Sequence, residues 1–157
     1  MNELVTNFIE DAGNTAQSFG LGRVVGQIYA YLFFSPDPRG LQDMQENLHI
    51  SKGSASMCVR QLEGWGAVKK VWVKGDRRDY YEANDWFGKV LKNVLADVAS
   101  KRFSDRDALY AAAEAQLTKL NGSPEAAFLR DRIAHLKSFE TKARRVWNNP
   151  LMQALLG

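Results

Sequence analysis

Hydrophobic residues recur at helical spacing along almost all of this 157-residue chain, and the spacing changes to two only between Val68 and Ala83. Residues 68–74 and 79–83 are β-branched or aromatic runs of strand length, and residues 75–78 between them suit a hairpin loop. This hairpin is the only β element that the pattern predicts. The sequence therefore favours a mainly α-helical fold with a small β-hairpin.

Helices account for most of the remaining chain. They are predicted at residues 3–18, 22–34, 41–48, 51–65, 85–103, 105–121 and 124–147. Pro36, Pro38 and Gly40 end the second of these, because prolines and glycine do not continue a helix. Ser51 is expected to N-cap the fourth by accepting a hydrogen bond from an unpaired backbone N–H.

The last predicted helix carries a row of apolar residues at near-heptad spacing. Ser123 and Pro124 are expected to begin this helix, after a stop at Asn121 and Gly122. The row consists of Leu129, Ile133, Leu136, Ala143 and Trp147. Such a row is typical of a core face or of a face that packs on a partner helix.

Composition excludes several classes of protein. The chain is 45% hydrophobic and 25% charged, which is close to the average soluble globular domain. No apolar run reaches the roughly 18 residues of a membrane helix, and residues 1–4 do not begin a secretory signal. A cytoplasmic protein is the expectation. No phosphate loop, nucleophile elbow or catalytic dyad is found, so an enzyme is not predicted.

Cysteine and histidine give no sign of a metal site or a cofactor. The single cysteine, Cys58, excludes an internal disulfide and a cysteine-based zinc site. It is expected to be half buried between core positions rather than to act as a redox switch. His49 is predicted to lie in a turn and His135 on a solvated helix face.

The charge of the chain is distributed unevenly. The net charge is +3, but residues 1–49 are acidic overall and residues 50–80 carry seven basic side chains against three acidic ones. The seven are Lys52, Arg60, Lys69, Lys70, Lys74, Arg77 and Arg78. A basic segment in a nearly neutral chain indicates local contact with a polyanion.

The order helix, turn, helix and basic hairpin is that of a winged helix-turn-helix, whose chemistry suits duplex DNA. A helix fits the major groove, where polar side chains grip phosphates and read base edges. Gly53 lets the backbone approach closely, and Met57 can contact a thymine methyl. The predicted DNA-binding residues are Ser51, Lys52, Gly53, Ser54, Ser56, Met57, Arg60, Lys74, Arg77 and Arg78.

The hairpin tip is expected to enter a minor groove. Arg77 and Arg78 lie between the two predicted strands, and narrow A·T-rich minor grooves attract arginine. Asp76 and Asp79 flank them and can pair with them. Exposed pairs of this kind contribute only about 0–1 kcal/mol of stability, so orienting the arginines would be their main effect.

Several motifs of residues 19–86 together resemble the GbsR-like branch of the MarR superfamily. The matching segments are residues 19–23 (FGLGR), 41–44 (LQDM), 50–56 (ISKGSAS), 62–68 (LEGWGAV) and 75–81 (GDRRDYY). The chain departs at Met57, where many relatives have arginine. The resemblance implies a homodimeric transcription factor with three regions: a dimerisation or core helix at 1–19, a DNA-binding domain at 20–86 and C-terminal dimerisation helices at 87–157.

The resemblance also implies a choline-like effector, which a cage of aromatic side chains would bind, because aromatic faces bind quaternary ammonium groups. The candidates are Tyr29, Tyr31, Phe33, Phe34, Trp65, Trp86 and Phe87, with Tyr29, Phe33, Trp65 and Trp86 preferred. Aromatic residues at helical spacing are more often core. The sequence leaves open whether there is an effector and what it is.

These observations lead to one functional hypothesis and one rival. The hypothesis is a transcriptional regulator that acts as a repressor. It binds a pseudo-palindromic operator in double-stranded DNA as a homodimer. The rival is a winged-helix adaptor that binds other proteins and no specific DNA. The clustered phosphate-binding groups Lys52, Arg60, Arg77 and Arg78 favour the first.

Overall fold

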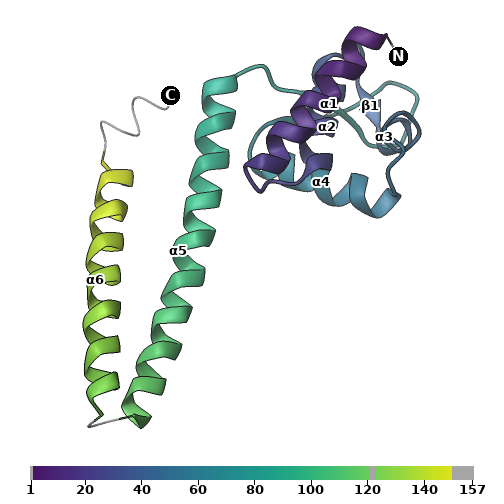
Figure 1. Ribbon diagram of the computed structural model, residues 1–157. Coiled ribbons are helices and arrows are strands. Elements are labelled where there is room, and N and C mark those ends of the chain that lie inside the picture. The colour runs from purple at the N-terminus through teal and green to yellow at the C-terminus, as the bar shows by residue number, and fades with distance from the viewer. Residues whose placement is uncertain (1, 121–122, 150–157) are drawn as a thin grey trace. The chain divides into compact units, whose positions relative to one another are not determined.

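The computed structural model describes residues 2–120 and 123–149 (Figure 1). The chain forms two compact units, Met1–Val90 and Leu91–Gly157. In chain order the elements are α1 (Glu3–Ser18), α2 (Arg23–Phe33), β1 (Arg39–Gly40), α3 (Leu41–Leu48), α4 (Lys52–Gly64), β2 (Val68–Val71), β3 (Tyr80–Ala83), α5 (Phe87–Lys119) and α6 (Pro124–Trp147). The predicted fold class, a mainly helical winged helix-turn-helix, is confirmed.

Helices α1 and α2 pack very closely in the first unit. The side chain of Asn2 caps α1, since its Oδ1 accepts a hydrogen bond from the backbone N–H of Leu4 at 3.0 Å. Gly26 of α2 lies against α1 so tightly that a Cβ built on it would be 2.1 Å from the carbonyl oxygen of Ala12. The glycine is therefore what allows the two backbones to approach.

Gly26→Ala is expected to lower the free energy of unfolding by about 2 kcal/mol or more, because the added methyl meets backbone and the helices must separate. Gly64→Ala is the matched control, because a Cβ at Gly64 meets nothing within 4 Å and alanine favours helix. Urea unfolding followed by circular dichroism compares the two variants. Equal stability of Gly26→Ala and the wild type would contradict the close packing of α1 on α2.

Helices α3 and α4 form the helix-turn-helix, and its core is nearly free of solvent. His49 makes the turn with a left-handed φ of 53°, as the C-cap of α3. Met44 of α3 is 0% exposed and Val59 of α4 is 1% exposed, and Ile28 of α2 is also fully buried. Burial of these side chains fixes the outward face of α4.

The sheet has three strands rather than the two that the hairpin pattern predicts. Its order is β1-β3-β2, and both pairings are antiparallel. The predicted hairpin is confirmed, with Val68 opposite Ala83 and Lys70 opposite Tyr81, but its first strand ends at Val71, so the predicted strand residues 72–74 belong to the loop. Strand β1 adds only Arg39, opposite Tyr81, and Gly40, opposite Tyr80. Two residues are too few for period-two alternation to be recognised, and this strand exists only because β3 offers it a partner.

The second unit consists of the rest of α5 together with α6. The predicted break between residues 103 and 105 is wrong, because α5 runs unbroken from Phe87 to Lys119. Ser104 and Asp105 are only moderately poor helix formers, and neither removes a backbone N–H as proline does. The predicted start of α6 is confirmed: Ser123 Oγ accepts from the N–H of Ala126 at 3.0 Å. The predicted stop at Asn121 and Gly122 lies outside the described residues.

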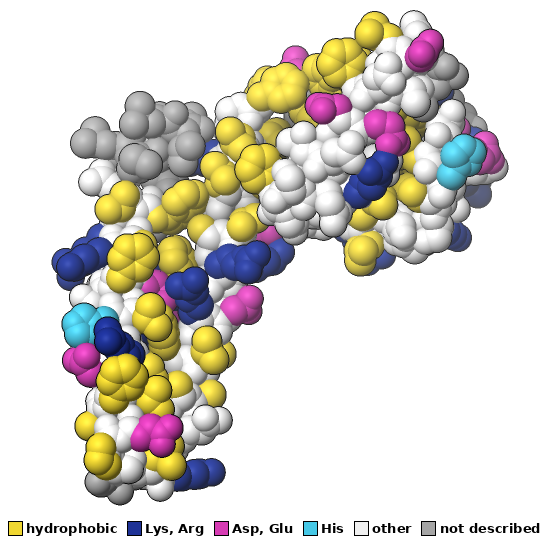
Figure 2. All heavy atoms as spheres, viewed as in Figure 1, with side chains coloured by type: hydrophobic (Ala, Val, Ile, Leu, Met, Phe, Trp, Pro, Cys, Tyr) yellow, Lys and Arg dark blue, Asp and Glu magenta, His cyan; other side chains and the backbone are white. Residues whose placement is uncertain are grey.

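The inner face of α6 differs from the predicted apolar row. Leu136 is 55% exposed, whereas Glu140 is 4% exposed. Arg144 Nη2 donates to Glu140 at 3.3 Å and to Asp107 of α5 at 2.6 Å. Glu140 is also 3.9 Å from Arg106 of α5. Charged pairs therefore occupy part of the contact between α5 and α6, while hydrophobic side chains are exposed along both helices (Figure 2).

None of the helices in the described ranges is both long enough and apolar enough to cross a lipid bilayer.

Candidate nucleic-acid interface

The N-terminus of α4 is held in place by Ser51. Its Oγ accepts a hydrogen bond from the backbone N–H of Ser54 at 3.1 Å and donates one to Ser54 Oγ at 3.0 Å. The predicted N-cap is confirmed. Both hydroxyls of this pair are thus engaged with each other, and their first effect is to set where α4 begins.

Helix α4 has one buried face and one open face. Ala55, Cys58, Val59 and Leu62 are buried. The exposed residues at the opposite face are Lys52, Gly53, Met57 and Arg60, with Ser56 half-buried. Met57 is hydrophobic but is 64% exposed, because nothing in the first unit covers it. The helix therefore presents lysine, arginine and methionine together on a free surface.

Arg60 is held along the surface of α4. Its Nη2 donates to Ser56 Oγ at 3.0 Å, and its Nε donates to the carbonyl oxygen of Ser56 at 3.4 Å. This bond between residues four apart keeps the guanidinium on the open face. It also gives Ser56 a positioning role toward Arg60.

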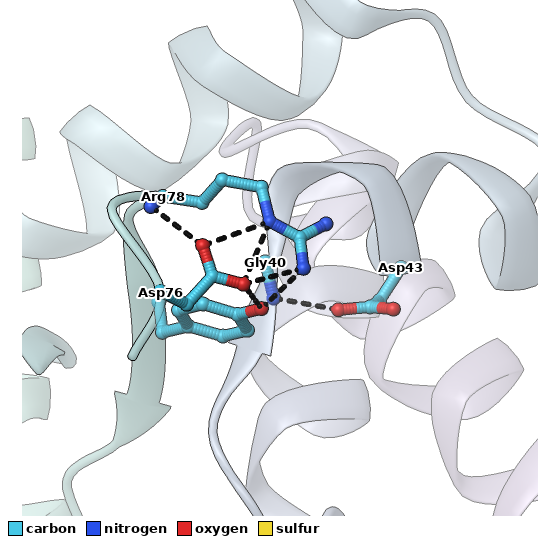
Figure 3. Close-up of polar contacts among 5 residues, drawn as sticks. Gly40, Asp43, Asp76 and Arg78 are labelled. Carbon is cyan, nitrogen blue, oxygen red and sulfur yellow. Dashed lines mark hydrogen bonds and ion pairs between the residues drawn. The ribbon is translucent and has the colours of Figure 1, made fainter. Parts of the chain in front are cut away.

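A compact cluster of polar side chains organises the tip of the wing, the hairpin of β2 and β3 (Figure 3). Both carboxylate oxygens of Asp76 accept hydrogen bonds from Arg78 Nε, at 3.1 and 3.0 Å, and Oδ2 also accepts from Arg78 Nη2 at 2.6 Å. The hydroxyl of Tyr80 donates to Asp76 Oδ2 at 2.8 Å and accepts from Arg78 Nη2 at 2.7 Å. We call Asp76, Arg78 and Tyr80 the wing-tip cluster.

Hydrogen bonding within the wing-tip cluster shifts its ionisation. The side-chain and backbone hydrogen bonds from Arg78 hold the pKa of Asp76 well below its usual range. The side-chain hydrogen bond to Asp76 in turn raises the pKa of Arg78. Both groups are therefore charged at neutral and mildly acidic pH. The guanidinium also lies over the Tyr80 ring, 5.5 Å from its centroid, so Arg78 has a defined orientation.

A groove of about 770 Å³ lies between α3, α4 and the wing. Lys52 of α4 and Arg77 and Arg78 of the wing line it, so basic residues from two separate elements come together there. Two acidic residues, Glu46 and Asp79, line it as well. We call this the basic groove.

The wing lysines and Arg77 differ in their partners. Lys69 pairs with Glu82 and Lys70 with Asp79, each at 2.6 Å. Arg77 is exposed, and no hydrogen bond or ion pair joins it to another residue of the described ranges. Lys74 is exposed at the other end of the wing loop. Arg77 and Lys74 are thus the wing residues whose charges are most available to an outside partner.

Sequence reasoning missed the contribution of α3 to the basic groove. Gln42 and Gln45 line it. Gln42 donates to Glu46 at 2.8 Å, and Gln45 donates to the carbonyl of Leu41 at 3.0 Å. The two glutamines, three residues apart on a half-exposed helix, could have indicated this contribution. Amide side chains are common contacts to phosphates and base edges.

The aromatic residues considered for an effector fall into different environments. Tyr29 and Phe33 of α2 lie with Phe87, and the Phe33 and Phe87 ring centroids are 5.2 Å apart. Trp65 is 5% exposed at the end of α4, so neither of its faces is open to a ligand. Trp86 is 67% exposed, and Lys89 Nζ lies 5.3 Å from its ring centre, where a ligand cation would sit.

Of the remaining two aromatics, Tyr31 lies elsewhere on α2, whereas Phe34, at the end of α2, contacts Phe33 with ring centroids 5.3 Å apart. Tyr31 is buried, and burial is the main reason that its pKa is raised. Phe34 packs on Phe8 of α1 with ring centroids 5.1 Å apart. Four of the seven aromatic residues, Tyr29, Phe33, Phe34 and Phe87, therefore form one connected group of rings.

Cys58 is more buried than the half burial that the sequence predicts. It is 5% exposed, and burial raises the pKa of its thiol. Burial of the neutral thiol disfavours the thiolate that redox chemistry requires. In residues 2–120 and 123–149, His, Cys, Asp and Glu form no group of three that could hold a metal ion.

Comparison with known proteins adds the following. No protein-family model matches the chain. It is 25% identical over 114 residues to the HTH-type transcriptional repressor OpcR of Bacillus subtilis (strain 168), which covers 73% of this chain and 62% of OpcR. It is 31% identical over 87 residues to the HTH-type transcriptional repressor GbsR of the same strain, which covers 55% of this chain and 48% of GbsR.

A solved structure agrees with the fold. The crystal structure of a transcriptional regulator superposes with a TM-score of 0.53 at 23% identity, over 88% of this chain and 94% of that chain. The alignments to OpcR and GbsR span between 48% and 62% of the length of these curated relatives. In sequence the chain is similar to HTH-type transcriptional repressors, and in fold it is a winged helix-turn-helix.

Proposed function

We propose that the chain is a sequence-specific regulator of transcription that binds double-stranded DNA. The observation that carries the proposal is the basic groove, where Lys52 of α4 meets Arg77 and Arg78 of the wing. In the proposed complex the open face of α4 occupies a major groove. Met57 and Arg60 meet base edges there, while Lys52 and the wing arginines meet phosphates and the adjacent minor groove.

The proposal includes a homodimer that acts as a repressor. Large hydrophobic side chains on α5 and α6 are exposed in the single chain, and a second copy would cover them. They are Leu91, Leu109, Phe128, Leu136, Phe139 and Val146. Repression is proposed because OpcR and GbsR are named repressors. An effector near Tyr29, Phe33 and Phe87 remains part of the hypothesis, since ligand binding must favour one of two conformations to change DNA affinity.

Selection from a random duplex library at near-physiological salt tests this function. Enrichment of an inverted repeat with half-sites about 10 base pairs apart is the expected result, because a two-fold dimer presents two copies of α4 one helical turn apart. Weak binding that falls with salt and enriches no sequence would contradict the proposal. It would favour the rival function, a winged-helix adaptor for other proteins.

Single substitutions separate residues that read bases from those that grip phosphates. Met57→Ala and Arg60→Ala are expected to change which half-site is enriched, because both residues lie on the open face of α4. Arg77→Ala is expected to weaken binding to operator and random DNA by similar factors, and to reduce the salt slope by about 1. Fluorescence anisotropy at several salt concentrations measures both. Equal loss on all duplexes for all three variants would refute the role of α4.

A further inference from the structure

The wing carries the most exposed large hydrophobic side chain of the described residues. Trp72 directly follows Val71, the last residue of β2, and 78% of its surface is exposed. No hydrogen bond, ring contact or ion pair joins it to another residue in the ranges 2–120 and 123–149. An apolar ring of this size gains free energy when a partner removes it from water. Trp72 is therefore available to a partner outside the chain.

Two other tryptophans of the first unit differ from Trp72 in this respect. Trp65 is 5% exposed at the end of α4. Trp86 is 67% exposed, but Lys89 Nζ lies 5.3 Å from the centre of its ring. Within the part of the chain that the structure describes, no such cation lies over the ring of Trp72. Among these three, Trp72 is the one whose ring is best able to meet an external partner.

Trp72 begins a short loop that is fixed at both ends. Val71 is paired with Tyr80, so residues 72–79 form a loop between two paired strands. Inside the loop, the backbone N–H of Asp76 donates to the carbonyl oxygen of Val73 at 3.2 Å. The wing-tip cluster orders the other side of the loop. Binding through an ordered loop costs less conformational entropy than binding through a mobile one.

The surroundings of Trp72 are basic. Residues 69–79 contain five basic side chains and two acidic ones. Lys74 and Arg77 are exposed, and neither forms a hydrogen bond or an ion pair with another described residue. A partner that covers the indole therefore also meets these cations. A polyanion is the class of partner that gains from both contacts.

A second copy of the chain does not suit this surface. In a two-fold contact the same patch of each copy meets its counterpart, so Trp72 against Trp72 would bring two basic loops together. Repulsion between like charges opposes such a contact. Duplex DNA, in contrast, has phosphates for the cations and deoxyribose rings, whose carbon–hydrogen faces are apolar, for the indole. The charge around Trp72 therefore favours DNA as its partner.

We propose that Trp72 is a DNA-contacting residue whose indole packs on the deoxyribose rings that wall the minor groove entered by Arg77. This inference rests on the function proposed above. In it, Arg77 supplies an ionic contact that releases counterions, whereas Trp72 supplies an apolar contact that releases none. The wing therefore contributes a part of the affinity that does not depend on salt.

Trp72→Ala is expected to weaken binding to the selected operator by about tenfold, because the buried apolar contact is lost. The salt slope is expected to stay at the wild-type value, since no phosphate contact is removed, whereas Arg77→Ala reduces it by about 1. Trp72→Phe keeps an aromatic ring and should recover most of the affinity. Fluorescence anisotropy at several salt concentrations measures all of these quantities.

Phe19→Ala is the matched control. Phe19 is 70% exposed in the same unit, at the C-cap of α1, and it caps the helix through its backbone N–H. Its substitution removes an exposed aromatic ring outside the wing, and operator affinity should not change. Since Trp72 is exposed as well, both alanine variants should keep the wild-type circular dichroism spectrum.

Quenching by acrylamide, a neutral molecule, reports on Trp72 directly. The difference in emission between the wild type and Trp72→Phe isolates the fluorescence of this indole. Acrylamide should quench that fluorescence strongly in the free protein, where the side chain is 78% exposed. Operator DNA is expected to remove most of the quenching, because the deoxyribose rings would cover the indole.

Three results would overturn the inference while the wild type still selects an operator, so that the proposed function stands. They are wild-type affinity in Trp72→Ala, undiminished acrylamide quenching of Trp72 in the complex, and a salt slope lowered as in Arg77→Ala. The first two would leave the indole free for a protein partner, and the third would show that a cationic contact had been lost instead. If the wild type selects no operator, the proposed function fails and this contact fails with it.

Discussion

Replacing Asp76 with asparagine is expected to weaken operator binding by about tenfold, although the change removes a negative charge from the wing. Asp76 holds Arg78 through both carboxylate oxygens and holds the hydroxyl of Tyr80. Asparagine cannot accept the paired hydrogen bonds of the guanidinium in this way. Arg78 would then lose its orientation, and each encounter with DNA would have to restore it.

The prediction is informative because the net charge of the wing alone would have the opposite effect on DNA binding. If the wing acted only through its net charge, Asp76→Asn would tighten binding, because repulsion between the carboxylate and the phosphates would disappear. Asp79→Asn is the matched control: it removes the same charge from the same loop, but Asp79 pairs with Lys70 and not with Arg78. Anisotropy titrations on the selected operator should show weaker binding for Asp76→Asn alone. Equal tightening in both variants would exclude orientation of Arg78 as the mechanism.

Gly53→Leu is expected to stabilise the fold and to impair DNA binding. A Cβ at Gly53 meets only Ser51 Oγ, at 3.9 Å, so the protein's own packing does not require glycine there. Leucine is the better helix former by about 0.5–1 kcal/mol. In the proposed complex, however, the side chain would occupy space that the DNA needs. The resulting clash of about 1–3 kcal/mol corresponds to a roughly fivefold to 150-fold loss of affinity.

Gly64→Leu separates the two effects of this substitution. Gly64 is the last residue of the same helix, and a Cβ there also meets nothing within 4 Å. It lies at the opposite end of α4 from Lys52, the residue of this helix that lines the basic groove. Both variants should keep the wild-type circular dichroism spectrum, and only Gly53→Leu should lose affinity for the selected operator. Normal binding by a well-folded Gly53→Leu would show that DNA does not approach the first turn of α4.

Much of the first unit could be predicted because its signals are local. Hydrophobic spacing located α1 to α4, Ser51 marked the beginning of α4, and the change of period marked the hairpin. Each signal depends on backbone geometry and on neighbours within a few residues. The open face of α4 followed directly, since helical periodicity assigns Ala55, Val59 and Leu62 to one side and Lys52, Met57 and Arg60 to the other.

Features that depend on distant partners could not be predicted in this way. Strand β1 is two residues long and is defined by its pairing with β3. Glu140 is buried because Arg106 and Arg144 accompany it, although a lone glutamate favours solvent. The sequence also predicts a false break in α5. Ser104 and Asp105 have only modest helix propensity, but they remain helical within this long helix.

The fold class, the approximate boundaries of α1 to α4 and the side chains on the open face of α4 can all be predicted from the amino-acid sequence. Those properties follow from the repeat of the backbone. The meeting of Gln42 and Gln45 of α3 with Lys52 of α4 and the wing arginines in one groove, by contrast, follows only from how the chain folds. Such contacts join residues from separate elements, and no periodic pattern encodes which of those residues will meet.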